Sequence, residues 1–154
     1  MHAQPQTQTD DLDAFEISTD KGRLDLDRVE QFLRASYWAS GRPRSLIERS
    51  IANSLCVGVY RRSDGLQVGF CRIVTDYATF GWLADVFIDG QFRGRKLGER
   101  MLAALISLPE VAGLRLVLAT RDAHSLYEKV GFEVLPNPDR WMIRPEAGEQ
   151  ADSS

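Results

Sequence analysis

The sequence has few of the residues that build disulfide frameworks or metal centres. Its 154 residues include two cysteines, Cys56 and Cys71, and two histidines. The cysteines form no Cys-x-x-Cys pair and, with so few histidines, supply no zinc ligand set. No stretch approaches the ~20 consecutive apolar residues of a membrane-spanning helix, and the N-terminus has no apolar signal core. These absences predict a reduced, cytoplasmic protein without a metal, with no membrane partner and with packed rather than reactive thiols.

The remaining composition is that of one ordinary globular domain. Hydrophobic residues make up 44% of the chain and charged residues 27%, which is enough apolar surface for a core without staples. The polar segments 1–13 and 146–154 are predicted to be disordered tails, so a single domain is expected over 14–145. The formal net charge of −3 argues against a nucleic-acid partner. Much of the acidity lies in residues 1–30, so the rest of the chain has an excess of bases.

Periodicity and turn residues predict an α/β (α+β) domain with helices on both faces of a mixed sheet. The expected order is β-α-α-β-β-β-α-β-α-β-β. The predicted strands are 15–17, 55–61, 66–75, 80–88, 114–119, 132–135 and 140–143. The predicted helices begin at Asp25 or Asp27, at a capping box over 45–48, at Arg95 and at Asp122. The apolar run 80–88 indicates burial on both faces, and Gly131 is expected to end the last helix in a left-handed conformation.

One turn, residues 91–98, places bases where a helix begins. Arg93, Arg95 and Lys96 stand where the helix dipole favours acids, and each cation costs ~0.3–1 kcal/mol there unless an anion binds. Gly94 and Gly98 leave backbone amides accessible to a ligand. The pattern predicts a pyrophosphate site. The alternative is a solvated, arginine-rich helix start with incidental glycines, and neither common glycine-rich nucleotide motif is present.

Two motifs in this order, residues 88–98 and 123–132, make the chain resemble the GNAT superfamily of N-acetyltransferases. The resemblance covers about residues 14–144. The family pattern is Arg or Gln, two residues, Gly, one residue, then Gly or Ala. Arg93 and Gly98 occupy its ends, but Lys96 stands in place of the central Gly. Thr120 stands where many members have Asn.

The resemblance implies acetyl-CoA as co-substrate, with no metal. It places the pantetheine arm along Val86, Phe87 and Ile88, where a backbone N–H would polarise the thioester carbonyl. The pyrophosphate would then lie on the basic turn. The residues of that turn expected to bind it are Arg93, Gly94, Arg95, Lys96, Leu97 and Gly98.

Two residues are catalytic candidates. Tyr127 matches the family tyrosine that protonates the leaving thiolate, and the alternative is that its ring only packs on the sheet. Asp85 lies within an apolar strand, where an unpaired charge is expensive. It is expected to act as a general base or to hold the acceptor ammonium. The alternative is a structural ion pair, for which Arg72 is the candidate partner. His124 is interpreted as a surface or structural residue.

The acceptor side is expected near Tyr37, Trp38, Arg42 and Arg44. Aromatic rings with nearby arginines could receive an amine that also bears a carboxylate, although Tyr37 and Trp38 could equally be core residues. The predicted function is acetyl transfer from acetyl-CoA to a primary amine of a small molecule by direct attack in a ternary complex. The alternatives are a catalytically silent acyl-CoA-binding regulatory module and an anion-binding interaction protein. A homodimer is left open.

Overall fold

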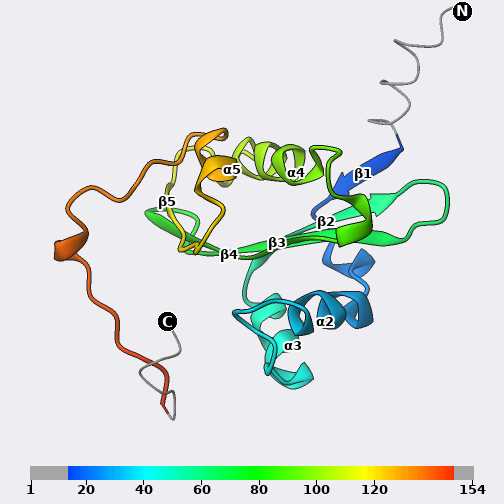
Figure 1. Cartoon of the computed structure of the whole chain (residues 1–154), viewed down its shortest axis with the longest axis horizontal. Coiled ribbons are helices and arrows are strands. Elements are labelled where there is room, and N and C mark those ends of the chain that lie inside the picture. The colour runs from blue at the N-terminus through cyan, green and yellow to red at the C-terminus, as the bar shows by residue number, and fades with distance from the viewer. Residues whose placement is uncertain (1–13, 148–154) are drawn as a thin grey trace, which may run out of the picture.

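Five strands form one mixed sheet in the order β1-β2-β3-β4-β5 in the computed structural model, which describes residues 14–147 (Figure 1). β1 to β4 pair antiparallel, and β5 is parallel to β4. The strands are β1 (Phe15–Ser18), β2 (Leu55–Arg61), β3 (Gln67–Thr75), β4 (Phe80–Ile88) and β5 (Arg115–Val117). The predicted tails lie outside the described residues, except for Glu146 and Ala147.

Helices cover both faces of this sheet, as the sequence predicts (Figure 1). Two of them, α2 (Leu26–Arg34) and α3 (Arg44–Ala52), lie on one face. The other face carries α4 (Leu97–Ile106) and α5 (His124–Glu128). The 3-10 turns are η1 (Lys21–Arg23), η2 (Gly90–Phe92) and η3 (Pro138–Arg140). No helix among residues 14–147 is long and apolar enough to cross a bilayer.

Each helix layer buries an apolar stripe at helical spacing. The Asp25 carboxylate caps α2 by accepting from the N–H groups of Asp27 and Arg28. The buried stripe of this helix, Val29, Phe32 and Leu33, packs against Phe70 of β3. On the opposite face, α4 buries Leu97, Met101, Leu102 and Leu105 against β2, β3 and β4. The domain therefore has two hydrophobic cores, one on each face of the sheet, and the central strands, including β4, lie between two helix layers.

The second half of β4 departs from regular pairing on both of its edges. Toward β3, Phe87 pairs with Phe70 and Ala84 with Arg72, so β4 carries one extra residue between these pairs. Asp85 lies in this bulge with a φ of 56°. Toward β5, pairing covers only Phe80–Trp82. Beyond Trp82, β4 therefore presents an edge to which no strand of the described chain is paired.

The prediction of two strands at the end of the domain, 132–135 and 140–143, is wrong. The structure has no strand there among the described residues. Residues 132–135 line a small cavity beside β5, and the chain after them runs away from the sheet (Figure 1). Met142 is 97% exposed and Ile143 is 86% exposed. An apolar, β-branched pattern forms a strand only where an edge is available to pair with it, and Pro136 and Pro138 supply no N–H donors.

Three local predictions are also wrong. The capping box over 45–48 is absent, because α3 has Pro43 as its N-cap and the Glu48 carboxylate contacts Arg44. Asp122 does not cap α5, whose N-cap is Ala123. β4 is not buried throughout, since Trp82 is 40% exposed.

The end of α5 agrees with the sequence. Gly131 has a φ of 99°, and the N–H of the next residue, Phe132, donates to the carbonyl of Tyr127 at 3.1 Å.

Candidate active site

Two cavities flank the open edge of β4. We call the first the arginine cavity; its volume is about 770 Å³, and its lining includes Trp38, Arg42, Arg72, Trp82, Asp85 and Arg121. The second, the turn cavity, has a volume of about 630 Å³ and extends from the end of β4 to the first turn of α4. Tyr37, Trp38, Val86 and Arg121 line both cavities. Each volume is in the range of small-ligand sites, and the two cavities adjoin at Val86.

Most of the residues predicted to bind the cofactor line the turn cavity. These are Val86, Phe87, Ile88, Arg93, Gly94, Lys96, Leu97 and Gly98. Arg95 is not among the lining residues, because its guanidinium lies over the rings of Phe15 and Phe92, 5.9 and 5.8 Å from their centroids. The structure thus separates the side chain of Arg95 from those of Arg93 and Lys96, which the sequence had grouped together.

The first turn of α4 offers backbone donors to the turn cavity. Its N-cap, Lys96, makes no side-chain capping hydrogen bond, and the following residues Leu97, Gly98 and Glu99 line the cavity. A helix start without such a cap has N–H groups available to a ligand and a partial positive charge. With Arg93 and Lys129 in the same lining, the donor set suits a phosphate or pyrophosphate.

The backbone of the basic turn explains the glycine of the family pattern. Gly94 has a φ of 83° and Lys96 a φ of 60°, so both occupy the left-handed region. A non-glycine residue there is strained by about 1–2 kcal/mol. Lys96 is therefore a charged residue in a backbone conformation that glycine adopts with less strain.

We expect Lys96→Gly to raise the melting temperature by about 2–4 °C, because relief of this strain outweighs the extra chain entropy of glycine. Thermal unfolding measures the change. Gly94→Ala is the matched control and should lower the melting temperature, since Gly94 shares the left-handed conformation. A destabilised Lys96→Gly protein would show that Lys96 makes stabilising contacts that outweigh its strain.

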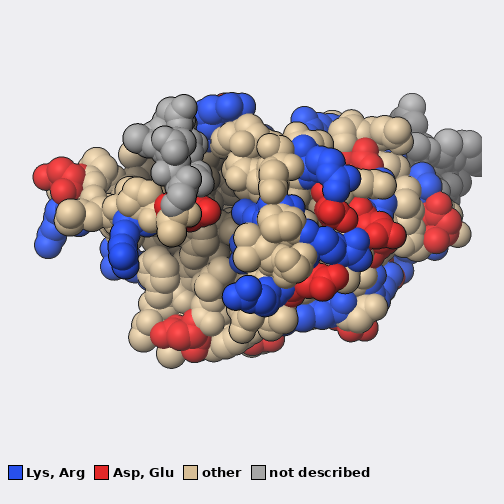
Figure 2. All heavy atoms as spheres, turned by 90° about the horizontal axis from the view of Figure 1, so that it is seen from below, with Lys and Arg blue, Asp and Glu red and all other residues tan. Residues whose placement is uncertain are grey.

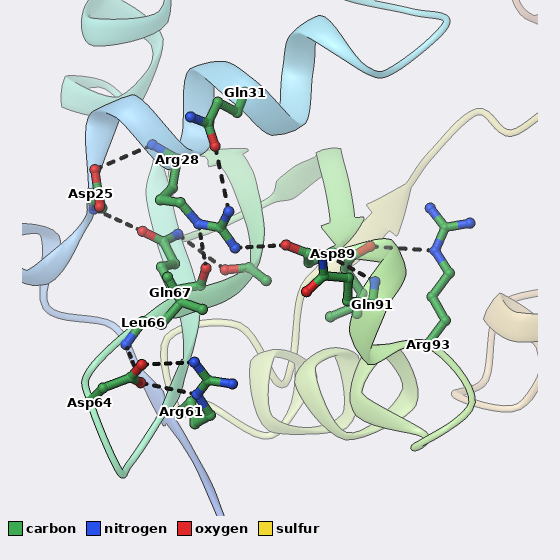
Figure 3. A network of polar contacts seen from close by, with 12 residues as sticks. Asp25, Arg28, Gln31, Arg61, Asp64, Leu66, Gln67, Asp89, Gln91 and Arg93 are labelled. Atoms are coloured by element: carbon green, nitrogen blue, oxygen red, sulfur yellow. Dashed lines mark hydrogen bonds and ion pairs between the residues drawn. The ribbon is translucent and has the colours of Figure 1, made fainter.

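A chain of polar contacts anchors the start of this turn to the opposite helix layer (Figure 3). Arg28 of α2 donates to the Asp89 carboxylate at 2.7 Å and to the Gln67 carbonyl at 2.9 Å. Asp89 also accepts from the Gln91 N–H. Burial opposes ionisation of Asp89, but the Gln91 N–H and the Arg28 guanidinium outweigh it and lower its pKa. The junction between β4 and the basic turn is therefore held by a charged pair that ties it to α2.

The Asp85 carboxylate lies at the wall of the arginine cavity, and its side chain is 2% exposed. It accepts from Arg72 Nε at 2.7 Å, from Arg42 Nη1 at 2.8 Å and from Trp38 Nε1 at 2.8 Å. Burial raises the pKa of Asp85, but Arg72, Arg42 and Trp38 outweigh it and the net pKa is lowered. The ion pair with Arg72 that the sequence allowed is present, and a carboxylate with three donors has little capacity left to accept a proton.

The acceptor-side candidates separate into two groups. Tyr37, Trp38 and Arg42 line the arginine cavity, with Tyr37 and Trp38 substantially exposed rather than part of the core. Arg44 lies elsewhere and contacts the carboxylates of Asp27, Glu30 and Glu48. These pairs belong to the face of α2 and α3, on which basic and acidic side chains intermingle (Figure 2).

Tyr127 packs in the core beside the sheet, with its ring edge-on to Phe132. It lines a smaller cavity of about 140 Å³ and is absent from the lining of the two larger cavities, although its neighbours Ala123 and Leu126 line the turn cavity. Burial raises the pKa of Tyr127 to about 12, with Cys71 and Tyr37 adding to the effect. The phenol is therefore protonated at any neutral pH.

The histidine and cysteine candidates lie outside the two large cavities. His124 is exposed on α5 and lines only the small cavity. Cys56 and Cys71 are buried free thiols; burial raises the pKa of Cys56 to about 11 and that of Cys71 further, as expected for packed cysteines. Among residues 14–147, no three histidine, cysteine or acidic side chains are grouped as metal ligands.

Trp82 and Arg121 are site residues that the sequence did not reveal. Arg121 stacks on the Tyr37 ring at 3.8 Å from its centroid, and its backbone N–H donates to the Tyr37 hydroxyl at 3.2 Å. This contact joins the segment after α2 to the loop after β5, across the junction of the two cavities. In the sequence Trp82 is one more member of the apolar run of β4, and Arg121 belongs to no motif, so neither carried a local signal.

The chain is similar to known acetyltransferases. The chain matches the family model described as acetyltransferase (GNAT) domain over residues 53–134. It is 30% identical over 135 residues to the Gibberella zeae protein named "Putative acetyltransferase FG08082", covering 73% of this chain and 75% of that protein. The chain belongs to the GNAT acetyltransferase family, whose members use acetyl-CoA as co-substrate.

Solved structures agree with this assignment. A GNAT-family protein from Xanthomonas campestris pv. campestris superimposes with a TM-score of 0.82 at 39% identity, over 87% of this chain and 94% of that one. Glucosamine-6-phosphate N-acetyltransferase from Arabidopsis thaliana superimposes with a TM-score of 0.57 at 19% identity, over 85% and 97% of the two chains. The second likeness concerns the fold alone.

Proposed function

We propose that this chain transfers the acetyl group of acetyl-CoA to the primary amine of a small molecule by direct attack in a ternary complex, using the domain over 14–145. The observation that carries the proposal is the open edge of β4 between two adjoining cavities. One cavity has the donors for a pyrophosphate and the other has room for an acceptor. A direct transfer requires both substrates to meet at one point. That point would lie at the wall that the two cavities share, which includes Val86 of β4.

The residues of the turn cavity fit the co-substrate. Arg93, Lys96 and the first turn of α4 would hold its phosphates, and the unpaired edge of Val86, Phe87 and Ile88 would pair with its amide-containing arm. Acetyl-CoA supplies the acetyl group as a thioester. The β4 edge supplies backbone N–H groups of the kind that stabilise a developing oxyanion.

Tyr127 and Asp85 take different roles in this proposal. The Tyr127 phenol is the proton donor to the leaving thiolate, a role that matches the family tyrosine. Its raised pKa keeps it protonated at neutral pH and also makes it a weaker acid than an exposed phenol. Asp85 is a positioning residue, because its carboxylate is occupied by Arg72, Arg42 and Trp38. Asp85 is therefore not the base in this proposal, and the acceptor amine loses its proton to solvent.

A second candidate function is a catalytically silent acyl-CoA-binding module. It is favoured by the absence of Tyr127 from the lining of both large cavities. Thiol release measured across a panel of amines discriminates the two functions: an enzyme releases CoA in proportion to acetylated amine, and a silent module releases none.

Calorimetry tests the co-substrate site. We expect acetyl-CoA to bind and Arg93→Gln to weaken binding about tenfold, the value of one charge-assisted hydrogen bond to phosphate. Arg95→Gln should cause a smaller loss, because its guanidinium lies over Phe15 and Phe92. S-acetyl-pantetheine, which lacks the pyrophosphate, is the ligand control and should bind wild type and Arg93→Gln equally. Absence of acetyl-CoA binding at high micromolar concentration would refute the proposed function.

A further inference from the structure

We propose that the acceptor is an amine that also carries an anionic group, a carboxylate or a phosphate, on an apolar or aromatic body, and that Arg42 and Arg121 bind that group in the arginine cavity. This inference rests on the proposed acetyl transfer and names the substrate class of the same site. It follows from three properties of the cavity: its charge, its exposed aromatic rings and the fixed position of Arg42.

The lining of the arginine cavity carries three guanidinium groups and one carboxylate. Asp85, the carboxylate, is already bonded to Arg72, Arg42 and Trp38. A simple cationic amine would therefore meet an excess of positive charge and no available acid among the lining residues. An anionic group on the same molecule reverses this balance, because three guanidinium groups of the lining share the Asp85 carboxylate and a 3.8 Å contact from Arg121 to Asp122, which leaves a net positive charge.

The two arginines have donors to offer. Arg42 has five N–H groups, of which the described structure assigns one, on Nη1, to Asp85. The side chain of Arg121 is 65% exposed, is held over the Tyr37 ring and makes only a long contact, 3.8 Å from Nη2, to the exposed carboxylate of Asp122. Arg72 is less suited, since Nε contacts Asp85 and Nη1 contacts Ser54, and its side chain is only 12% exposed. Planar guanidinium groups fixed in this way bind carboxylate or phosphate through paired hydrogen bonds.

The aromatic lining identifies the rest of the molecule. Trp38, Trp82 and Tyr37 are all at least 40% exposed, although large rings of this kind are usually covered in a folded domain. They present flat apolar surface beside the arginines, which suits an aromatic or aliphatic group. The positive lining has a second consequence: it disfavours the protonated form of a bound amine and so favours the neutral nucleophile. This effect matters here because Asp85 is already occupied.

The test uses amines in matched sets that differ in the anionic group. The carboxylate arm compares phenylalanine with its amide and with 2-phenylethylamine, and tyrosine with tyramine. The phosphate arm compares glucosamine 6-phosphate with glucosamine. Rates are expressed per unprotonated amine, because the carboxylate also changes the amine pKa. We expect kcat/KM at least about tenfold higher for the anionic member in one arm or both, and the arm that responds identifies the group.

Substitutions of the arginines test whether Arg42 and Arg121 bind the anionic group of the acceptor. Arg42→Gln should reduce kcat/KM for the preferred anionic amine about tenfold and reduce that of its neutral counterpart much less, so that the preference collapses. Arg121→Gln should act in the same direction. Arg44→Gln is the matched control, since Arg44 contacts Asp27, Glu30 and Glu48 outside the cavity, and the preference should persist.

A binding measurement tests the anion site independently of turnover. Calorimetry of the protein saturated with CoA compares N-acetyltyrosine with N-acetyltyramine, and N-acetylglucosamine 6-phosphate with N-acetylglucosamine. Tighter binding of an anionic product, lost in Arg42→Gln, supports the inference. Equal or tighter binding of the neutral products, or equal kcat/KM within every set, overturns it. Failure of the proposed function is separate, since it requires that acetyl-CoA fails to bind or that no amine releases CoA.

Discussion

Asp85→Asn is expected to lower the free energy of unfolding by about 3 kcal/mol, which corresponds to about 6–12 °C in melting temperature. The substitution leaves the buried guanidinium of Arg72 without its counter-charge. It also replaces one of the two carboxylate oxygens, which accept from Arg42 and from Trp38, by an amide NH2 group that cannot accept. Misplacement of these groups by ~1 Å should reduce kcat/KM about a hundredfold. Asparagine tolerates the φ of 56° at this position, so the backbone of the bulge is preserved.

Two companion variants distinguish the effect of the lost charge on stability from the effect of backbone strain. Asp85→Ala should be less stable than Asp85→Asn by about 1 kcal/mol, because alanine adds left-handed strain. Asp85→Asn combined with Arg72→Met should be more stable than Asp85→Asn alone, since it removes one of the stranded charges. If Asp85→Asn unfolds at the temperature of the wild type, the carboxylate does not hold the two arginines in place.

The stability of the wild type should also depend on pH through this group. The pKa of Asp85 is lower in the folded protein than in the unfolded chain, so its stabilising contribution is present above the unfolded value of ~4. It is lost as pH falls through the lowered folded value. Denaturant melts between about pH 5 and pH 2 should show a shallower acid limb for Asp85→Asn than for wild type.

Tyr127→Phe is expected to reduce kcat about a hundredfold, the usual contribution of one general acid, with acetyl-CoA affinity unchanged within about twofold. The phenylalanine ring keeps the edge-on contact with Phe132, so the melting temperature should change little. Steady-state kinetics and calorimetry together measure the split between kcat and binding. Full turnover in Tyr127→Phe would refute the proton-donor role.

Tyr60→Phe is the matched control for this experiment. Tyr60 is also buried with a pKa raised to about 12 by burial, but it lines none of the cavities described above. Its hydroxyl has no hydrogen-bond partner among the described residues, so its removal should leave kcat unchanged and raise stability. The pH profile adds a further check. A donor with a pKa of about 12 predicts no descending limb of kcat below about pH 11.

Elements with strong local patterns were predictable from the sequence. β4 combines an apolar run with β propensity, α4 repeats its buried residues at helical spacing, and Gly94 permits the turn between them. Each of these signals acts over a few residues, as do the Asp25 cap and the left-handed Gly131. For this reason the basic turn and most residues expected at the cofactor site lie together in the structure.

Predictions that depended on a distant partner were less successful. The segments 132–135 and 140–143 have a strand pattern, but neither is paired with a strand in the described chain, and pairing depends on the position of a partner remote in the sequence. The role of Asp85 could not be chosen from the sequence, because Trp38 and Arg42 lie 47 and 43 positions away along the chain. Burial and hydrogen-bond partners decide a carboxylate's pKa, and neither is a local property.

The sequence alone therefore determined that this is an α/β domain of the acetyltransferase type with a basic, glycine-containing turn at the start of α4. These features follow from short-range periodicity, capping and backbone preference. Only the tertiary structure decided that the pairing of β4 with β5 ends at Trp82 and that the Asp85 carboxylate accepts from three donors. It also decided that Arg42, Arg121 and three aromatic rings line one cavity. Those properties arise where segments remote in sequence pack together, because the charge and shape of a cavity belong to all of its walls at once.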